Sequence, residues 1–267
     1  MNSTTGLSVR AVASLPGFTL DVGWTVGPGF TVLFGYSGAG KSLTLATIAG
    51  VMRPQHGRIR LGERLLFDSA SQTWTPPQDR RIGYVSQGAQ LFPHMTVRRN
   101  VEFALAGVPR GGRAERVAEL LERFRVSNLA DKRPHQLSGG QRQRAALARA
   151  LAPSPDALLL DEPLSALDLP IRVEMRELLR QVQRELAIPV VMVTHDLYEA
   201  CTLADTLVVY SGTGTVQTGT PRELVGEPAT PEIRRLLHAI ELPASVLEKR
   251  NGSDARIIPI DRKEHVA

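Results

Sequence analysis

The chain has 267 residues and a formal net charge of +5, with 42% hydrophobic and 22% charged residues, which fits a globular protein with a substantial core. A single cysteine, Cys201, excludes an intramolecular disulfide and favours a reducing compartment. No apolar run approaches the ~18–20 residues that cross a bilayer, and the N-terminus lacks a signal-peptide pattern. We therefore expect a cytoplasmic protein that reaches any membrane through a partner.

The basic residues are nearly all arginines, and they alternate with Glu and Asp, as in residues 113–125. This pattern is typical of solvated helix faces. The sequence has no basic patch interleaved with aromatic residues, which single-stranded nucleic acids favour. Charge therefore argues against nucleic acid as a partner, although it leaves that alternative open.

The first elements in chain order have the alternation of an α/β protein. Residues 30–34 form a short run of strand formers, residues 35–42 are a glycine-rich loop, and residues 43–50 have a helical pattern. Residues 57–67 have the pattern of a small hairpin, and residues 81–87 form another strand with a polar end.

The glycine-rich loop reads GYSGAGKS and matches G-x-x-x-x-G-K-[ST] between a strand and a helix, which is the context this motif requires. Its glycines let successive N–H groups converge into an anion nest at the helix N-terminus. Lys41 supplies a mobile charge for the β- and γ-phosphates, and Ser42 a hydroxyl for Mg²⁺. The alternative is a glycine turn that happens to contain Lys-Ser. The residues predicted to bind nucleotide are Gly35, Tyr36, Ser37, Gly38, Ala39, Gly40, Lys41 and Ser42.

The middle of the chain, about residues 88–152, is almost purely helical. Apolar residues recur with helical spacing over 98–107, 114–125 and 141–152. Strands are predicted on both sides of it. We therefore expect a helical insertion between two halves of an α/β sheet.

After the insertion, residues 157–163 form a continuous apolar strand, as expected when both faces of a parallel sheet are covered. A single apolar stripe predicts a helix over 171–186, and residues 190–196 and 207–210 form further strands. In the tail, two short apolar runs around a turn signal predict a β-hairpin within 242–260.

Four polar residues end or follow predicted strands, at the sheet edge where ligands of α/β proteins bind. Asp161 is suited to hold Mg²⁺, and Glu162 to polarise a water for attack on the γ-phosphate. Gln87 can reach the Mg²⁺ or this water, and His195 can bond the γ-phosphate. The alternatives are a helix N-cap cluster for the carboxylates and ordinary caps for Gln87 and His195. Together these residues predict catalysis by Glu162, His195 and Gln87, with Ser42, Gln87 and Asp161 as metal ligands.

A second glycine-containing turn, LSGGQ, comprises Ser138, Gly139, Gly140 and Gln141. The simpler interpretation is a helix cap with Ser138 as the N-cap. The same exposed N–H groups also attract anions. Because the loop at 35–42 already serves one nucleotide, this turn is predicted to contact the nucleotide of another molecule.

The motifs GYSGAGKS, Gln87, LSGGQ, LLLDEP, SALD and His195 occur in the order and approximate spacing of ATP-binding-cassette (ABC) ATPases. The chain resembles that family over about residues 8–240. The resemblance implies a head-to-tail homodimer, with ATP and Mg²⁺ held between the glycine loop of one copy and the LSGGQ turn of the other. It also implies that Asp168, within SALD, communicates between the two sites.

The resemblance further implies a P-loop fold over residues 1–241, with a RecA-like sheet core, an antiparallel β subdomain and the helical subdomain at about 88–152. Residues 242–267 are expected to form a short C-terminal β extension. Molybdate-type cassettes usually carry a larger oxyanion-binding domain there. We interpret the extension as a remnant or a short variant of such a regulatory domain.

Residues 18–22, 53–68 and 76–101 look like the cassettes of molybdate importers, with sulfate, ferric-iron and sugar importers close behind. This likeness implies an ATPase that powers uptake of a small solute, most simply molybdate. The expected partners are integral-membrane permease subunits and, indirectly, a periplasmic or extracellular solute-binding protein. The expected location is the cytoplasmic face of the inner membrane. Rival interpretations are a nucleic-acid-acting cassette ATPase and an inactive nucleotide sensor, and Glu162 and His195 argue against the latter.

In such importers, a short permease helix docks on the surface that follows strand 81–87. Leu91, Phe92, Pro93 and His94 are expected to line that groove, unless Leu91 and Phe92 are simply core residues.

The family usually stacks adenine on an aromatic residue well before the glycine loop. The corresponding position, near Ala13, is not aromatic, and Phe18 is the expected substitute. Loss of the stacking residue would weaken nucleotide binding without abolishing it.

Overall fold

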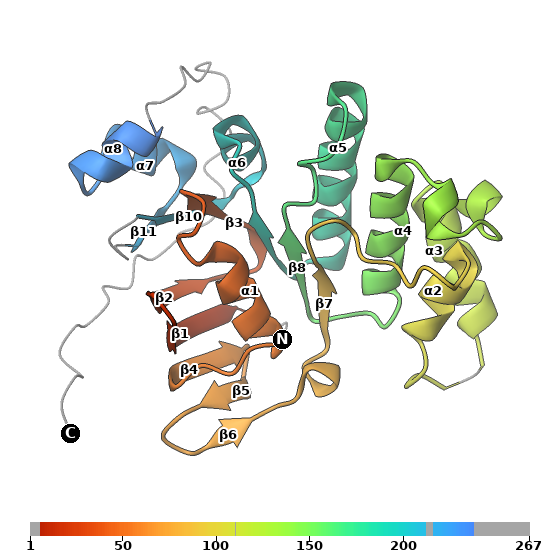
Figure 1. Ribbon diagram of the computed structural model, residues 1–267, viewed down its shortest axis with the longest axis horizontal. Coiled ribbons are helices and arrows are strands. Elements are labelled where there is room, and N and C mark those ends of the chain that lie inside the picture. Colours follow the sequence, from red (N-terminus) through yellow and green to blue (C-terminus); the bar gives the residue numbers. More distant parts are fainter. Residues whose placement is uncertain (1–5, 110, 212–215, 238–267) are drawn as a thin grey trace.

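Two β-sheets with one helix between them form the centre of the molecule (Figure 1). The structure is a computed structural model that describes residues 6–109, 111–211 and 216–237. Its parallel sheet, antiparallel sheet and helical region confirm the predicted fold class. The predicted hairpin within 242–260 lies outside the described residues.

The larger sheet has the strand order β11-β10-β3-β9-β8-β7, and its strands are parallel except for β11, which is antiparallel to β10. Strands β8 and β9 are buried along their full length, as their apolar sequences predict. Because parallel strands end at one edge, the segments that follow β3, β7, β8 and β9 meet there. The strands are β3 (Gly29–Gly35), β7 (Ile82–Val85), β8 (Ala157–Asp161), β9 (Pro189–Val193), β10 (Thr206–Tyr210) and β11 (Val216–Gly219).

The smaller sheet is antiparallel, with the order β2-β1-β4-β5-β6. Alternate residues of β1 are buried, which is the pattern of a strand with one face on the core. This sheet is the predicted antiparallel β subdomain. Its strands are β1 (Leu7–Leu15), β2 (Phe18–Val26), β4 (His56–Leu61), β5 (Arg64–Asp68) and β6 (Thr73–Trp74).

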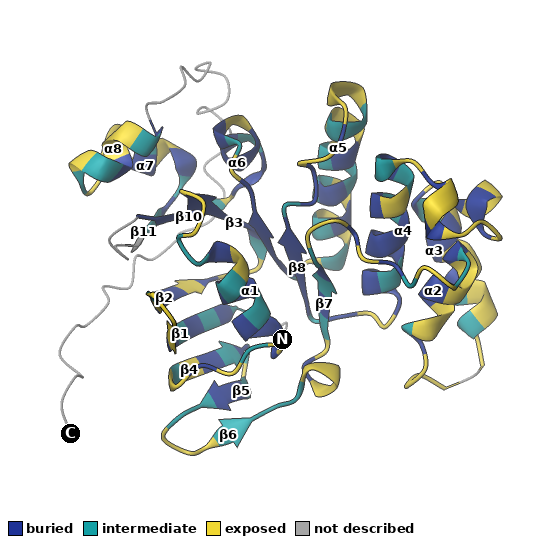
Figure 2. Ribbon diagram, viewed as in Figure 1, coloured by how far each residue is buried: buried dark blue, intermediate teal, exposed yellow. Residues whose placement is uncertain are grey.

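Helices cover the larger sheet on both faces (Figures 1 and 2). Helix α1 lies between the two sheets, where Leu45 and Ile48 are fully buried in a core shared with both. Residues of α4, α5 and α6 belong to a second core on the other face, which extends into α2 and α3. The helices are α1 (Lys41–Ala49), α2 (Val97–Phe103), α3 (Arg113–Arg123), α4 (Gly139–Leu151), α5 (Leu169–Leu186), α6 (Leu197–Leu203), α7 (Pro221–Gly226) and α8 (Pro231–Leu237). Among the described residues, none of these helices combines the length and apolar character that crossing a membrane requires.

Most predicted elements are confirmed, with differences at their ends. The predicted strand 81–87 stops earlier, because β7 ends at Val85 and a turn closed by Ala89 N–H on the carbonyl of Ser86 follows, with Gly88 at φ 80°. Gln87 therefore lies in this turn rather than on the strand. The predicted helix 98–107 ends at Phe103, and turns follow it. The sequence patterns omitted the strands β1, β2, β6 and β11 and the helices α6 to α8.

Candidate functional site

The glycine loop forms a compact nest between β3 and α1. Gly38 and Gly40 have φ values of 81° and 90°, in the left-handed region that favours glycine, and Gly40 is the N-cap of α1. Gly35 is required by space, since a Cβ there would lie 2.3 Å from the carbonyl oxygen of Tyr210. The loop therefore presents backbone N–H groups at a helix N-terminus, which is a site for an anion.

The Lys41 side chain folds back across this nest. Its Nζ donates hydrogen bonds to the carbonyl oxygens of Gly35 at 2.8 Å and Tyr36 at 2.7 Å. Burial lowers the pKa of Lys41, while the nearby Glu162 and Asp161 carboxylates oppose this shift. A buried cation that donates to carbonyl groups, with carboxylates nearby, is well placed to pair with an incoming anion.

Ser42 and Asp161 meet at the mouth of the nest. The Ser42 hydroxyl donates a 2.8 Å hydrogen bond to Oδ1 of Asp161. Asp161 is 5% exposed, and burial raises its pKa above the ordinary value, an effect that the Ser42 hydrogen bond opposes. This hydroxyl and carboxylate are the hard oxygen ligands that Mg²⁺ prefers when a nucleotide supplies the rest of its coordination. Within the described residues, no group of three or more His, Cys, Asp and Glu residues forms a metal site by itself.

Glu162 stands at the centre of the predicted catalytic edge. Its Oε2 accepts a 3.3 Å hydrogen bond from Nε2 of Gln87, and its Oε1 lies 3.5 Å from Nδ1 of His195. Its backbone has a φ of 47°, which is rare for a side chain of this size and is typical of functional sites. The carbonyl of Val193 accepts from Glu162 N–H, and Ser165 donates to the Glu162 carbonyl, so both neighbours hold this conformation. The structure thus brings together the three residues that the sequence predicted for catalysis.

The LSGGQ turn has the helix-cap geometry of the simpler interpretation. Ser138 Oγ accepts from Gln141 N–H, and Gln141 Oε1 accepts from Ser138 N–H, which makes a capping box at the start of α4. A Cβ on Gly140 would lie 2.7 Å from Cγ2 of Ile171, so α5 packs directly on this turn. In the described part of the chain, no hydrogen bond or ion pair joins this turn to the glycine loop. One copy therefore does not bring the two phosphate-binding segments together.

Asp168 lies outside the cluster around Glu162. It is exposed and is the N-cap residue of α5, but its side chain makes no capping hydrogen bond. Its carboxylate is therefore accessible to another molecule.

A buried chain of polar groups behind the glycine loop could not be recognised in the sequence. Trp24 Nε1 donates to the Tyr210 hydroxyl at 3.1 Å, which donates to Thr44 Oγ1 at 3.0 Å, and Thr44 donates to the Gly40 carbonyl at 2.9 Å. Tyr210 is 2% exposed, and burial raises its pKa to about 12. These hydrogen bonds tie both sheets to the glycine loop through residues that are far apart in sequence, and no local sequence pattern marks them.

The hairpin between β1 and β2 reaches the glycine loop from the other side. A Cβ on Gly40 would lie 2.6 Å from Leu20 Cδ1 and 3.1 Å from Phe18 Cζ. Phe18 is partly exposed, whereas Ala13 is 2% exposed and belongs to the core. Of these two positions, Phe18 is therefore the one with a ring beside the loop.

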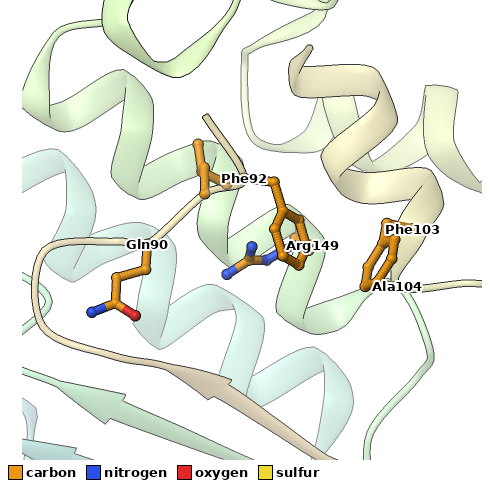
Figure 3. Close-up of a pocket in the computed structure, with 6 residues that line it drawn as sticks. Gln90, Phe92, Phe103, Ala104 and Arg149 are labelled. Atoms are coloured by element: carbon orange, nitrogen blue, oxygen red, sulfur yellow. The ribbon is translucent and has the colours of Figure 1, made fainter. Parts of the chain in front are cut away.

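A pocket of about 500 Å³ lies between the turn after β7 and helices α2 and α4 (Figure 3). Leu91 and Phe92 line it, together with Phe103 and Arg149. The rings of Phe92 and Phe103 meet edge to face at 4.7 Å, and the Arg149 guanidinium lies 5.4 Å from the centre of the Phe92 ring. The remaining lining residues are Gln90 and Ala104.

The other two residues expected in the permease groove lie outside this pocket. Pro93 and His94 are exposed and are not among its lining residues, although the centre of the His94 ring lies 6.1 Å from that of Phe92. Leu91 is 9% exposed, so it serves the core as well as the pocket wall.

Known proteins resemble this chain at the level of sequence. The ABC transporter family matches residues 20–165. The molybdate/tungstate import ATP-binding protein WtpC of Archaeoglobus fulgidus is 46% identical over 82% of this chain and 88% of its own length. The molybdenum import ATP-binding protein ModC of Paramagnetospirillum magneticum is 42% identical over 79% of this chain, which spans only 58% of that relative. The sulfate/thiosulfate import ATP-binding protein CysA of Thermosynechococcus vestitus is 44% identical over 84% of this chain and 66% of its own length.

A solved structure is similar to this chain in its fold. The ATP-binding cassette MJ0796, in a dimeric post-hydrolysis state bound to ADP and Pi, aligns with a TM-score of 0.68 and 29% identity. The alignment covers 80% of this chain and 98% of that one. The similarity thus extends over both sheets and the helical region rather than over one motif.

Proposed function

The chain belongs to the ABC transporter family of ATP-binding proteins, and on this premise we propose that it hydrolyses ATP to power import of molybdate through a separate permease. The observation that carries the proposal is the cluster at the sheet edge, where Glu162 lies within 3.3 Å of Gln87 and 3.5 Å of His195, beside the glycine loop. Sulfate and sugar importers are also among the relatives. These relatives leave sulfate and sugars as alternative solutes, and the sequence resemblance described above adds ferric iron.

The proposed roles follow from the geometry of each side chain. Lys41 exchanges its carbonyl partners for the β- and γ-phosphates, and the N–H groups of residues 35–42 hold the remaining phosphate oxygens. A bound Mg²⁺ would neutralise charge that develops on the phosphates. Ser42 and Asp161 would hold the metal, together with Gln87.

Glu162 is the proposed base in the hydrolysis step. Its carboxylate orients the attacking water and accepts a proton from it, while Gln87 holds one carboxylate oxygen in place. His195 reaches the other oxygen and is proposed to bond the γ-phosphate. The left-handed backbone of Glu162 places this side chain at the open edge of the sheet rather than in the core.

A second copy completes the site in this proposal. Within the described residues, no hydrogen bond or ion pair joins Ser138, Gly139, Gly140 and Gln141 to the glycine loop of their own copy, so they are proposed to cover the nucleotide of the other. Asp168 would contact the partner beside that nucleotide. We further propose that residues 1–241 are the ATP-binding domain, with the helical subdomain at about 88–152, and that residues 242–267 belong to a segment related to an oxyanion-binding domain.

The permease is proposed to dock on the pocket around Phe92. The pocket is apolar, with the edge-to-face rings of Phe92 and Phe103 as its walls, and 52% of Phe103 is exposed. It can take one apolar side chain from a short helix. The chain would then lie on the cytoplasmic face of the membrane, and a solute-binding protein would act on it only indirectly. No nucleic acid is expected among its partners.

The solute can be tested in vesicles that contain the chain, its permease and a solute-binding protein. Molybdate is expected to stimulate ATP hydrolysis, whereas sulfate and maltose are not. If sulfate stimulates hydrolysis and molybdate does not, the transported solute is sulfate rather than molybdate. Stimulation by DNA without a membrane complex would favour the nucleic-acid-acting alternative, and absence of phosphate release under every condition would favour a nucleotide sensor.

A further inference from the structure

The Arg172 side chain on α5 spans two loops that carry functional residues. Its Nη2 donates a 3.1 Å hydrogen bond to the Leu167 carbonyl. On its other side, Nη1 lies 3.7 Å from Oδ2 of Asp196 and Nε lies 3.6 Å from Oε1 of Glu199. One guanidinium therefore faces the loop before α5 and the start of α6 at the same time.

The first of these loops leads to the residues expected to meet a second copy. Leu167 is followed directly by Asp168, and the two are part of SALD. The Ala166 carbonyl oxygen would lie 3.4 Å from a Cβ on Gly139, so the same loop packs on the LSGGQ turn. If a partner displaced the LSGGQ turn, the Leu167 carbonyl group would be displaced with it.

The second loop holds His195 in a tightly bonded turn. Thr194 Oγ1 accepts from Asp196 N–H at 3.1 Å and donates to Glu199 Oε2 at 2.8 Å. Asp196 Oδ1 in turn accepts from Glu199 N–H at 3.0 Å. Because these bonds leave little freedom, His195 moves with Asp196 and Glu199, and its Nδ1 lies 3.5 Å from Oε1 of Glu162.

Arg172 has unused bonding capacity in this arrangement. Its Nε is buried and has no hydrogen-bond partner, and the 3.6 Å to Glu199 is longer than a hydrogen bond. Glu199 is itself only 3% exposed, so its carboxylate depends on a nearby cation. A shift of a few tenths of an ångström would form the missing bond, and it would draw the two loops together.

We propose that Arg172 is a positioning residue that makes the Leu167–Asp168 loop and the His195 turn move as one unit. The inference rests on the proposed function, since it concerns how contact with a second copy is passed to the turn that holds His195 beside Glu162. Arg172 does not touch the reacting atoms. It transmits the position of one loop to the other through its planar, multi-donor guanidinium.

Arg172→Lys tests this role, because one ammonium keeps a cation beside Glu199 but cannot bond both loops. The matched control is Arg176→Lys, one turn further along α5, where the guanidinium lies over the Tyr198 ring at 5.2 Å. We expect Arg172→Lys to keep the parent's melting temperature and ATP affinity while kcat falls about 10- to 100-fold. The dependence of rate on ATP should also lose its cooperativity, and the control should keep both properties.

A second measurement separates positioning from binding. In a Glu162→Gln background, Arg172→Lys should still dimerise with Mg·ATP, as measured by sedimentation. An active parent whose Arg172→Lys variant keeps its kcat and cooperativity would overturn the inference alone. A parent that does not hydrolyse ATP would overturn the proposed function together with this inference.

Discussion

Ser42 donates a 2.8 Å hydrogen bond to Asp161, although 119 positions separate the two residues in sequence. The bond joins the first turn of α1 to the end of β8, and thus the phosphate-binding loop to the carboxylate pair that follows β8. Because Asp161 is buried, its charge is expected to cost folding stability while it serves the site.

Asp161→Asn is expected to raise the free energy of unfolding at neutral pH while abolishing Mg²⁺-dependent hydrolysis. Burial raises the pKa of Asp161 above its ordinary 3.8, so the folded chain holds this proton more tightly than the unfolded chain. The parent therefore loses stability as the pH rises from 3.8 through the raised pKa, and a neutral amide avoids that loss. Urea unfolding at acidic and at neutral pH measures the difference.

Asp156→Asn is the matched control for this substitution. Asp156 pairs with Arg64 at 2.6 Å and Arg81 at 3.3 Å, so its neutralisation should lower stability. If Asp161→Asn also lowers the free energy of unfolding, burial is not the dominant influence on the pKa of Asp161.

Glu162→Gln is expected to keep ATP binding while slowing turnover by orders of magnitude. The amide is isosteric and can keep the left-handed backbone, but it cannot accept a proton from water. An ATP-bound dimer should therefore accumulate, as seen by sedimentation alongside a phosphate-release assay. Glu185→Gln, on the exposed face of α5, is the control and should hydrolyse ATP normally. Hydrolysis at the parent rate by Glu162→Gln would exclude it as the base.

Ser138→Asp distinguishes the two interpretations of the LSGGQ turn. Aspartate is as good an N-cap as serine, so a purely structural cap should tolerate it. A negative charge that faces the γ-phosphate of a second copy should instead abolish dimer formation and hydrolysis, while leaving the melting temperature unchanged. Thr96→Asp makes the same change at the N-cap of α2, where Thr96 accepts from Arg99 N–H, and should leave activity intact. Normal turnover in Ser138→Asp would argue for the cap alone.

Tyr210→Phe is expected to lower stability by ~1–3 kcal/mol, because it leaves the buried Trp24 N–H without an acceptor. Thr44 keeps its bond to the Gly40 carbonyl, so ATP affinity should fall only modestly. Denaturant unfolding followed by tryptophan emission measures the change. The half-buried Tyr84, whose hydroxyl makes no hydrogen bond within the described residues, is the control, and Tyr84→Phe should change stability by less than ~0.5 kcal/mol. Equal losses of stability in the two variants would show that the hydrogen bonds of Tyr210 do not contribute to the stability of the fold.

Phe18→Ala is expected to weaken ATP binding roughly 2- to 10-fold, which corresponds to the ~0.5–1.5 kcal/mol of an aromatic stacking contact. The reason is its position beside Gly40, from which the ring can reach an adenine. Leu15→Ala, at the paired position of the hairpin, controls for loss of exposed apolar surface. Calorimetric titration with ATP measures the affinity of both variants. If Phe18→Ala and Leu15→Ala bind ATP equally well, Phe18 does not contact the adenine.

Local chemistry was readable from the sequence. Three local features each depend on a few adjacent residues, so the local sequence determines them. They are the positive φ values of Gly38 and Gly40, the N-cap at Ser138 and the buried strand 157–161. The strand-end rule for parallel sheets also predicted that Glu162 and His195 would share an edge.

The tertiary structure alone decided which distant groups touch. The sequence does not state the strand order β10-β3-β9-β8, and that order carries Tyr210 to Thr44 and Ser42 to Asp161. The same holds for Arg172, whose two loops follow different strands. Hydrogen bonds and ion pairs act over a few ångströms. The partners from different elements are much farther apart along the chain: 24 positions separate Arg172 from Asp196, and 166 separate Thr44 from Tyr210. Only the folded chain brings them within that range.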